Sequence, residues 1–225
     1  MTSTSTSSRS FSQRPYVGPP GSTELWLVRH GASADSLEGE SFELVEGQGD
    51  PPLSDAGRHQ AEQVGLRLAQ EPFDALYVST LQRTVQTAAP LVARSGMIPL
   101  VDADLREVFL GEWEGGLLRM KSADEDPVFA QVLAEQRWDV IPGAESREAF
   151  GGRLRRAIER IAAAHPGGRV LVFSHGAAIG EILAQATDSE PFAFVGPDNA
   201  SISRLVVSPD RWIIRGYNDT AHLAG

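Results

Sequence analysis

Short apolar runs that alternate with segments of helical periodicity are the feature of this sequence that most limits its fold. Four such runs lie at residues 24–28, 75–78, 100–101 and 170–173. Between them, apolar residues recur at helical spacing and would share one helix face, as do Val85, Ala88, Ala89 and Val92. Strands that alternate with helices favour a parallel sheet covered on both faces. The expected fold is therefore α/β, with a mainly parallel sheet sandwiched between helices.

The remaining segments complete this pattern. Ser54 is suited to be the N-cap of a helix that carries Ala61, Val64 and Leu68 on one face. Two further helices are expected at about 150–161 and 177–185. A closing pair of strands is expected at 201–207 and 212–217. The stretches expected to be irregular are 31–52 and 111–145, the latter with a short helix near 128–135.

The length of 225 residues suits one domain, expected over residues 23–225. Residues 1–22 are rich in Ser, Thr, Pro and Gly and lack the apolar core of a signal peptide. A disordered tail is the favoured interpretation of this segment, and a transit peptide is the alternative.

Composition excludes several classes of partner and chemistry. The net charge of −10 repels nucleic acid and anionic membranes, so neither is an expected partner. The chain has no cysteine, which excludes disulfides, cysteine zinc sites and a cysteine nucleophile. No apolar run reaches membrane-spanning length, and a cytoplasmic location is expected.

Charged and imidazole side chains follow three of the predicted strands. The first strand runs into Arg29 and His30, the second leads to Arg83 one turn into its helix, and the fourth ends at His175. Ligands of open α/β sheets bind beyond the carboxyl ends of the strands. We therefore expect two imidazoles and two guanidiniums to converge at one edge of the sheet.

Sequence motifs carry a resemblance to a known family. They occur in one order along the chain, at residues 27–31, 53–61, 79–88, 105–107, 111–115, 142–146 and 174–176. Among them are Arg29-His30-Gly31, Leu105-Arg106-Glu107 and Ser174-His175-Gly176. Together they resemble the histidine phosphatase superfamily, which includes the cofactor-dependent phosphoglycerate mutases. The resemblance spans residues 24 to about 220 and implies a phosphoglycerate mutase-like fold.

The resemblance implies a role for each of five side chains. His30 would be the nucleophile that forms a phosphohistidine. Arg29 and Arg83 would bind the phosphate, for which planar guanidinium forks are well suited. His175 would add a further contact, and Glu107 would protonate the leaving oxygen and then act as base on water. No metal and no cofactor is implied, because the arginines take the electrostatic place of a metal ion.

One position departs from the family pattern. Ser36 stands where an Asn that binds the phosphate is expected, and a hydroxyl can donate only one hydrogen bond. Ser36 is carried over as a phosphate-binding candidate, and Ser33 is equally suitable. Asn199 is expected beside the pocket. Structural roles are expected for the remaining histidines, His59, His165 and His222.

The expected activity is hydrolysis of a small phosphorylated metabolite. A phosphoglycerate mutase-type transferase is the first alternative. It would need extra cations over the pocket, whereas residues 111–145 mix Arg119, Lys121 and Arg137 with acids. A non-catalytic protein that binds phosphorylated ligands is the second alternative, and a phosphatase acting on phosphohistidine in proteins is the third. The residues that contact the leaving alcohol are expected between 110 and 144, and no oligomeric state is predicted.

Overall fold

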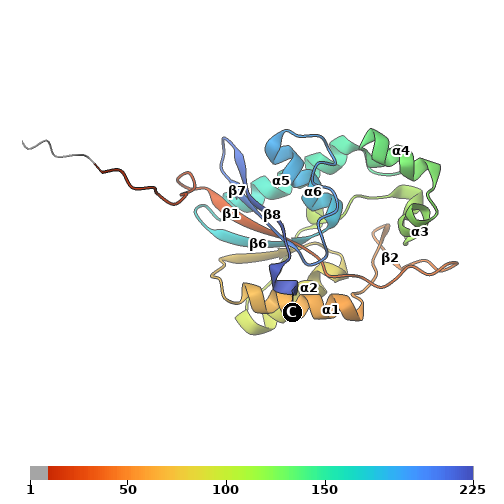
Figure 1. Cartoon of the computed structure of the whole chain (residues 1–225). Helices are drawn as coiled ribbons and strands as arrows, with labels where there is room; N and C mark the ends of the chain where they lie inside the picture. The colour runs from red at the N-terminus through yellow and green to blue at the C-terminus, as the bar shows by residue number, and fades with distance from the viewer. Residues whose placement is uncertain (1–9, 225) are drawn as a thin grey trace, which may run out of the picture.

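The computed structural model describes residues 10–224, which form a six-stranded sheet between two layers of helices (Figure 1). The strand order is β5-β4-β6-β1-β7-β8. The parallel strands are β5 (Leu100–Val101), β4 (Ala75–Val78), β6 (Arg169–Ser174) and β1 (Thr23–Arg29). β7 (Ile202–Val207) pairs antiparallel with β1, and β8 (Trp212–Asp219) pairs antiparallel with β7. The predicted α/β fold with a mainly parallel sheet is confirmed.

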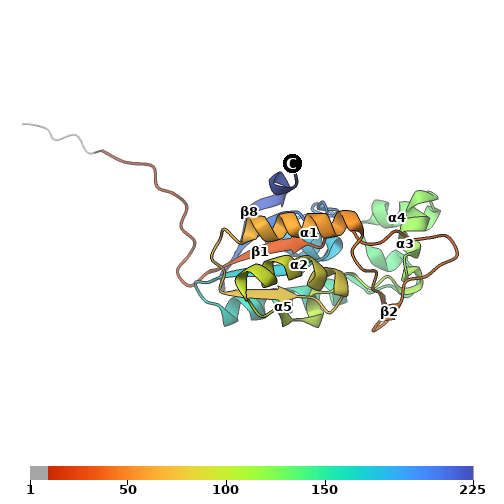
Figure 2. The same ribbon diagram turned by 90° about the horizontal axis from the view of Figure 1, so that it is seen from below.

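Two apolar cores bury the two faces of the sheet. On β1, Leu25 and Leu27 belong to one core, and Trp26 and Val28 belong to the other. This alternation follows from the period of two along a strand. The helices that cover the faces are α5 (Arg147–Ala164) and α6 (Gly176–Thr187) over the first core, and α1 (Asp55–Leu68) and α2 (Gln82–Ser95) over the second. Figure 2 shows α1 and α2 side by side on the second face.

The helix starts carry the expected caps. The Ser54 hydroxyl accepts a hydrogen bond from the Gly57 backbone N–H at 3.1 Å, which confirms Ser54 as the N-cap of α1. The Ser146 hydroxyl caps α5 in the same way, through the Ala149 backbone N–H at 3.2 Å. Because this cap precedes the first apolar position, α5 is longer than the predicted helix.

The segment of residues 111–144, here called the α3–α4 segment, contains more helix than predicted. α4 (Pro127–Glu135) corresponds to the expected short helix, and its N-cap Asp126 accepts a hydrogen bond from the Val128 N–H. α3 (Leu117–Ala123) is an additional helix that the sequence pattern does not predict. The segment has a small core of its own, in which Trp113, Val132 and Ile141 are buried. This packing, rather than helix propensity, stabilises α3.

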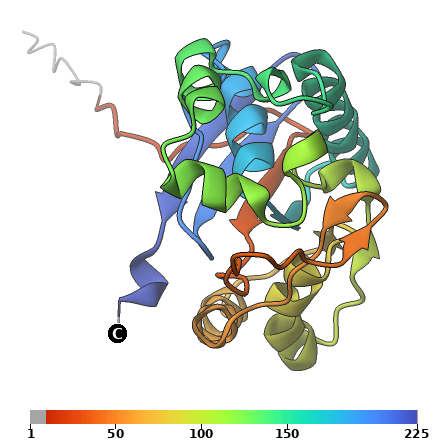
Figure 3. The same ribbon diagram turned by 90° about the vertical axis from the view of Figure 1, so that its right-hand side faces the viewer.

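The stretch 31–52 is predicted to be loop-rich, but it contains a short hairpin. β2 (Leu44–Val45) and β3 (Gln48–Gly49) pair around Glu46 and Gly47, both of which have positive φ. Figure 3 looks onto the carboxyl end of the parallel strands, where this hairpin and the α3–α4 segment both lie. Two segments outside the sheet therefore border the edge at which strands β1, β4 and β6 end.

Residues 10–22 contain no helix or strand, and β1 begins at Thr23. The first nine residues of the predicted tail lie outside the described residues, and the disorder of the tail stays a prediction. Within residues 10–224, no helix is both long and apolar enough to cross a membrane. The cellular location also stays a prediction.

The start of α1 packs directly against the loop that follows β1, and this contact depends on a glycine. A Cβ atom on Gly57 would lie 1.9 Å from the carbonyl oxygen of Ala32. We predict that Gly57→Ala lowers the free energy of unfolding by about 1–3 kcal/mol, because the backbone must shift. Urea denaturation followed by circular dichroism measures this loss.

Gly152→Ala is the matched control, because a Cβ atom there would meet only the flexible end of Arg156, at 3.4 Å. It should leave stability unchanged or raise it by up to about 1 kcal/mol, as alanine favours a helix. Equal stability of the two variants would contradict the prediction.

Candidate active site

Segments far apart in the sequence meet where the parallel strands end. β1 ends at Arg29 and leads into His30, while β6 leads into His175, the N-cap of α6. Arg83 lies in the first turn of α2, and Glu107 follows a short 3-10 helix, η1 (Ala103–Leu105). The rings of His30 and His175 are 5.1 Å apart between centroids. The structure thus brings the predicted side chains together at one edge of the sheet.

The orientation of the His30 ring is determined by two contacts. Nδ1 lies 2.7 Å from the carbonyl oxygen of Gly31, which can only accept, so Nδ1 carries the proton. Nε2 accepts a hydrogen bond from Nε of Arg83 at 3.3 Å, so its lone pair faces the guanidinium. Burial, followed by the charges of Arg83 and Arg29, lowers the pKa of His30 well below the ordinary histidine value. The ring is therefore neutral and nucleophilic at Nε2.

Arg83 is buried beside this nitrogen, and Arg29 is partly buried in the same cavity. Arg83 donates to the Gly49 carbonyl at 3.1 Å and lies 3.7 Å from the Asp50 carboxylate. Arg29 donates to the carbonyl of Pro197, and its Nε has no partner among the residues described. Burial lowers the pKa of each guanidinium, and the charge of Glu107 opposes this shift. Arginine nevertheless stays charged, so the site holds two fixed cations.

The carboxylate of Glu107 is bound to the N-terminus of α6. Its oxygens accept hydrogen bonds from the backbone N–H groups of Ala177 at 3.1 Å and Ala178 at 3.0 Å. A third N–H, from Val108, lies at 3.0 Å. Helix N-termini favour negative charge because their first N–H groups lack partners within the helix. The same helix start therefore positions both Glu107 and His175.

The backbone of Glu107 is fixed by two side chains. Its carbonyl accepts hydrogen bonds from Nη2 of Arg153 at 2.7 Å and from Nε2 of Gln48 at 2.8 Å. Arg153 also binds the carbonyls of Asp104 and Arg106. Arg153 is itself held by an ion pair with Glu145 at 2.8 Å. The segment before Glu107 is thus anchored to α5.

His175 lies behind the His30 ring and has no exposed surface. Its Nε2 is 2.8 Å from the hydroxyl of Ser79. Its Nδ1 is buried and has no hydrogen-bond partner within residues 10–224. Burial and the charge of Arg83 lower the pKa of His175 well below the ordinary value, so the ring is neutral and carries one proton.

A cavity of about 190 Å³ opens over these groups. Arg29, His30, Arg83 and Glu107 line its inner end. Apolar side chains also line it, from the region around the hairpin, from the residues that follow Glu107 and from the α3–α4 segment: Phe42, Pro51, Val108, Leu110, Trp113 and Leu118. Three further polar residues also line it: Gln48, Glu114 and Arg119. Glu114 and Arg119 lie in the region 110–144, where contacts to the leaving alcohol are expected, whereas Gln48 lies outside that region and outside every motif.

The two serine candidates do not join the inner groups. The Ser33 hydroxyl accepts a hydrogen bond from Arg119 at 2.7 Å, at the edge of the cavity. Ser36 does not line the cavity, and its buried hydroxyl would lie 2.7 Å from a Cβ atom on Gly116. Phosphate binding by Ser36 stays a prediction. Asn199 lies beside the site and donates to the His30 carbonyl at 3.0 Å.

Glu114 joins the hairpin to the α3–α4 segment across the cavity. One carboxylate oxygen accepts from the Gly49 N–H at 2.8 Å, and the other accepts from the Leu110 N–H at 2.8 Å. Burial raises the pKa of Glu114, and the two backbone hydrogen bonds oppose this shift. This carboxylate fixes the distance between the two walls of the cavity.

The remaining histidines lie outside the cavity. His59 is exposed on α1, Nε2 of His165 is 3.0 Å from the Tyr77 hydroxyl, and Nε2 of His222 is 3.0 Å from the Ala200 carbonyl. Across the described part of the chain, no group of three or more His, Asp or Glu side chains is arranged to hold a metal ion.

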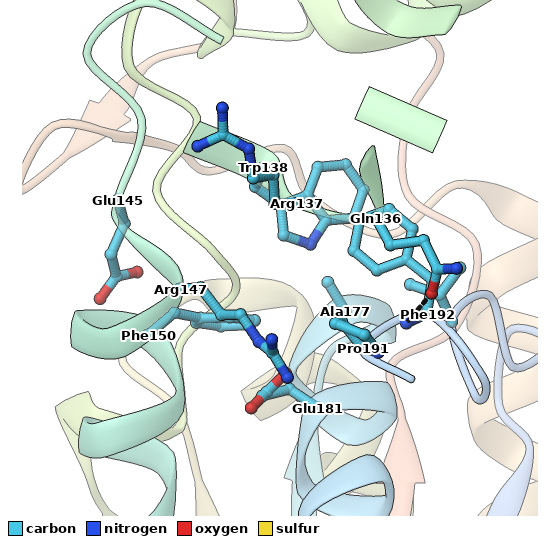
Figure 4. A pocket seen from close by; sticks show the side chains of 11 residues that line it. Gln136, Arg137, Trp138, Glu145, Arg147, Phe150, Ala177, Glu181, Pro191 and Phe192 are labelled. Carbon is cyan, nitrogen blue, oxygen red and sulfur yellow. Dashed lines mark hydrogen bonds between the residues drawn. The ribbon is translucent and has the colours of Figure 1, made fainter. Parts of the chain in front are cut away.

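A second, smaller cavity lies among the α3–α4 segment, α5 and α6 (Figure 4). Trp138, Phe150 and Phe192 line it, and Arg147 extends toward Glu181. Burial raises the pKa of Glu181. None of its lining residues is a histidine, so the chemistry expected of this protein belongs to the first cavity.

Known proteins resemble this chain in sequence. The sequence model of the histidine phosphatase superfamily (branch 1) matches residues 25–220. The "Phosphoglycerate mutase-like protein 4" of Arabidopsis thaliana is 33% identical over 205 residues, which cover 89% of this chain and 86% of that protein. The "Metal-independent phosphoserine phosphatase" of Arabidopsis thaliana is 30% identical over 206 residues, which cover 90% of this chain and 84% of that protein.

Among solved structures, mycobacterial glucosyl-3-phosphoglycerate phosphatase has a TM-score of 0.74 and 27% identity. The match covers 88% of this chain and 100% of that chain. A structure of that protein with inorganic phosphate is also similar to this chain. The predicted resemblance in sequence and fold is confirmed.

The buried histidines make stability depend on pH. Their pKa values are lowered on folding, so below the ordinary value of 6.5 the unfolded chain binds protons that the folded protein does not. Stability should be fully present above that pH and fall as the pH drops below it, by up to about 1.4 kcal/mol per pH unit for each histidine. Urea unfolding between about pH 5 and 8 measures the slope.

His30→Gln removes one of the two groups, and its slope should be shallower than that of the wild type by up to one proton. Equal slopes for the wild type and this variant would show that His30 is not held neutral by the fold.

Proposed function

Since the chain belongs to branch 1 of the histidine phosphatase superfamily, we propose that it hydrolyses small phosphomonoesters through a phosphohistidine on His30. The observation that carries this proposal is the state of His30. Its ring is neutral, its proton is held at Nδ1 by Gly31, and its Nε2 lone pair faces the guanidinium of Arg83. Such a nitrogen can attack phosphorus without first losing a proton.

Two displacements at phosphorus complete the reaction. In the first, Nε2 of His30 forms a bond to phosphorus and the bond to the alcohol oxygen breaks, while Glu107, which enters this step in its protonated form, donates that proton to the alcohol oxygen. In the second, water attacks phosphorus, Glu107 takes its proton, and the P–N bond breaks to release phosphate. Arg29 and Arg83 stabilise the charge on the equatorial oxygens in both steps.

The charges over the cavity favour hydrolysis over phosphoryl transfer. Transfer through a bisphosphorylated intermediate needs several cations around the cavity. Of the three cations predicted there, Arg119 lines the cavity. Lys121 is paired with Asp126 at 2.7 Å, and Arg137 is paired with Glu135 at 2.8 Å. The phosphoserine phosphatase relative also supports hydrolysis, whereas the mutase-like relative keeps transfer as the second candidate.

Two other activities fit the site less well: binding of phosphorylated ligands without catalysis, and hydrolysis of phosphohistidine in proteins. A protein that only binds phosphorylated ligands would gain nothing from Glu107, because this carboxylate shares the cavity with Arg29 and Arg83 and repels phosphate. A phosphatase of phosphohistidine in proteins would need an open site. Here Phe42, Trp113 and Leu118 line a cavity of only about 190 Å³, which favours a small leaving alcohol.

We predict that a phosphomonoester labelled with ³²P transfers its label to the wild-type protein, and that the label survives alkali but is lost in acid. His30→Ala should retain its fold, take up no label, and lose more than about a thousandfold in kcat/KM. Rapid quenching and circular dichroism measure these outcomes. Label in the variant would exclude His30 as the nucleophile.

Products of 3-phosphoglycerate, supplied with its bisphosphate primer, distinguish hydrolysis from transfer. Hydrolysis yields inorganic phosphate at a rate that the primer does not increase. Primer-dependent isomerisation faster than phosphate release would identify a transferase.

Glu107→Gln should slow formation of the phosphohistidine from alkyl phosphates by about 10²–10⁴-fold, because their leaving oxygen needs a proton. The same step with an activated aryl phosphate should slow by less than about tenfold. Single-turnover kinetics measure this step apart from hydrolysis of the intermediate. Glu112→Gln, a neighbour that does not line the cavity, is the control. Equal losses on both substrates would rule out Glu107 as the acid.

A further inference from the structure

The hydroxyl of Ser79 is a buried polar group that the proposed reaction does not use. Ser79 follows β4 and has no exposed surface, and its Oγ lies 2.8 Å from Nε2 of His175. We propose that Ser79 donates this hydrogen bond and thereby keeps the ring proton of His175 on Nδ1, the nitrogen that has no partner among the described residues and would donate to a phosphoryl group carried on His30, whose ring centroid lies 5.1 Å away. Ser79 is then a positioning residue that acts through His175. The inference rests on the proposed function.

The hydrogen bonds around Ser79 are consistent with this direction. A hydroxyl has one proton to donate and two lone pairs that accept. The backbone N–H of Leu81 donates to Ser79 Oγ at 3.2 Å, and the Thr84 hydroxyl lies 3.1 Å from it. When Thr84 donates to Ser79, both lone pairs are used. The single proton of Ser79 is then directed to Nε2 of His175.

A hydrogen bond in the opposite direction, from His175 to Ser79, would also leave the Ser79 hydroxyl fully hydrogen-bonded. The position of the proton on the His175 ring distinguishes the two arrangements. In that arrangement Nε2–H donates to Ser79, Ser79 donates to Thr84, and Thr84 donates to the Leu81 carbonyl at 2.9 Å. Nδ1 of His175 would then have no proton. A bare lone pair at this buried nitrogen would repel the oxygens of a phosphoryl group, whereas an N–H would bind them.

Because His175 is buried, the hydrogen bonds within the protein determine which of its ring nitrogens carries the proton. The ring of His175 is neutral, so it has one proton to place. A histidine in solution can exchange that proton between its nitrogens, but a buried hydrogen bond at one nitrogen fixes the tautomer. Nδ1 has no other partner in the part of the chain that the structure describes. Ser79 is therefore the group that can hold the proton in place before substrate binds.

The test combines tautomer and rate in matched variants. Ser79→Ala should shift the proton of His175 toward Nε2 and lower kcat on an aryl phosphate by about 10–100-fold, because one phosphoryl donor is misplaced. Ser79→Thr retains the hydroxyl and should restore at least part of kcat and of the wild-type tautomer of His175. Ser201→Ala is the control, since Ser201 is also buried but its hydroxyl has no partner among the described residues. It should leave kcat and the tautomer unchanged.

Two-bond ¹H–¹⁵N correlation spectra read the tautomer of His175 in the free protein and with inorganic phosphate. We expect a protonated Nδ1 in the wild type in both states. A proton on Nε2 of the wild type would overturn the proposal, as would a Ser79→Ala protein with wild-type kcat and tautomer. Thr84→Val removes the hydroxyl to which Ser79 would donate in the opposite arrangement, so the proton of His175 should stay on Nδ1 in this variant, and a shift to Nε2 there would also overturn the proposal.

The spectra need no turnover, so they separate this inference from the proposed function. A protein that hydrolyses no phosphomonoester but shows the Ser79-dependent tautomer would contradict the function and retain the hydrogen-bond assignment.

Discussion

The hydrogen bond from Nδ1 of His30 to the Gly31 carbonyl is the contact on which the chemistry depends. It leaves the ring a single lone pair, at Nε2, and that lone pair accepts a hydrogen bond from Nε of Arg83. The backbone on either side is fixed as well, since the His30 carbonyl accepts from Asn199 and the Gly31 N–H donates to Thr87. A rotated or protonated ring could not attack phosphorus. Under the proposed function, the fold would therefore supply a nucleophile that is ready before substrate arrives.

Under the proposed function, this acidic protein would bind a phosphate ester through cations that are concentrated at one place. Arg29 and Arg83 both lie beside His30, where low solvent exposure strengthens their field. Glu107 would cancel part of that field, but three backbone N–H groups bind its carboxylate. The acid and the cations can thus occupy one small cavity. The start of α6 makes this arrangement possible, because it orients Glu107 and His175 together.

The inner site could be predicted from the sequence because that site depends on buried strands. Apolar runs such as residues 24–28 and 170–173 are suited to burial in a sheet, and parallel strands bring their ends to one edge. The outer walls could not be predicted in this way. The β2–β3 hairpin pairs only a few residues and is held by contacts distant in sequence, such as that of Gly49 with Glu114. Ser36 occupies the position of the phosphate-binding Asn of the family, yet its hydroxyl lies near Gly116 rather than in the cavity.

The inner and outer parts of the cavity are stabilised largely by different contacts, and this difference bears on specificity. His30 and Glu107 are bound by backbone atoms at the sheet edge, whereas the α3–α4 segment has its own core around Trp113, Val132 and Ile141. Gly49, which contacts both Arg83 and Glu114, links the two parts. Lys121 and Arg137 pair with acids of that segment, which leaves Arg119 beside the cavity. Under the proposed function, changes in that segment would therefore alter the fit of the leaving alcohol without moving His30. Selectivity for the alcohol and reactivity toward phosphorus can then vary independently on the same sheet.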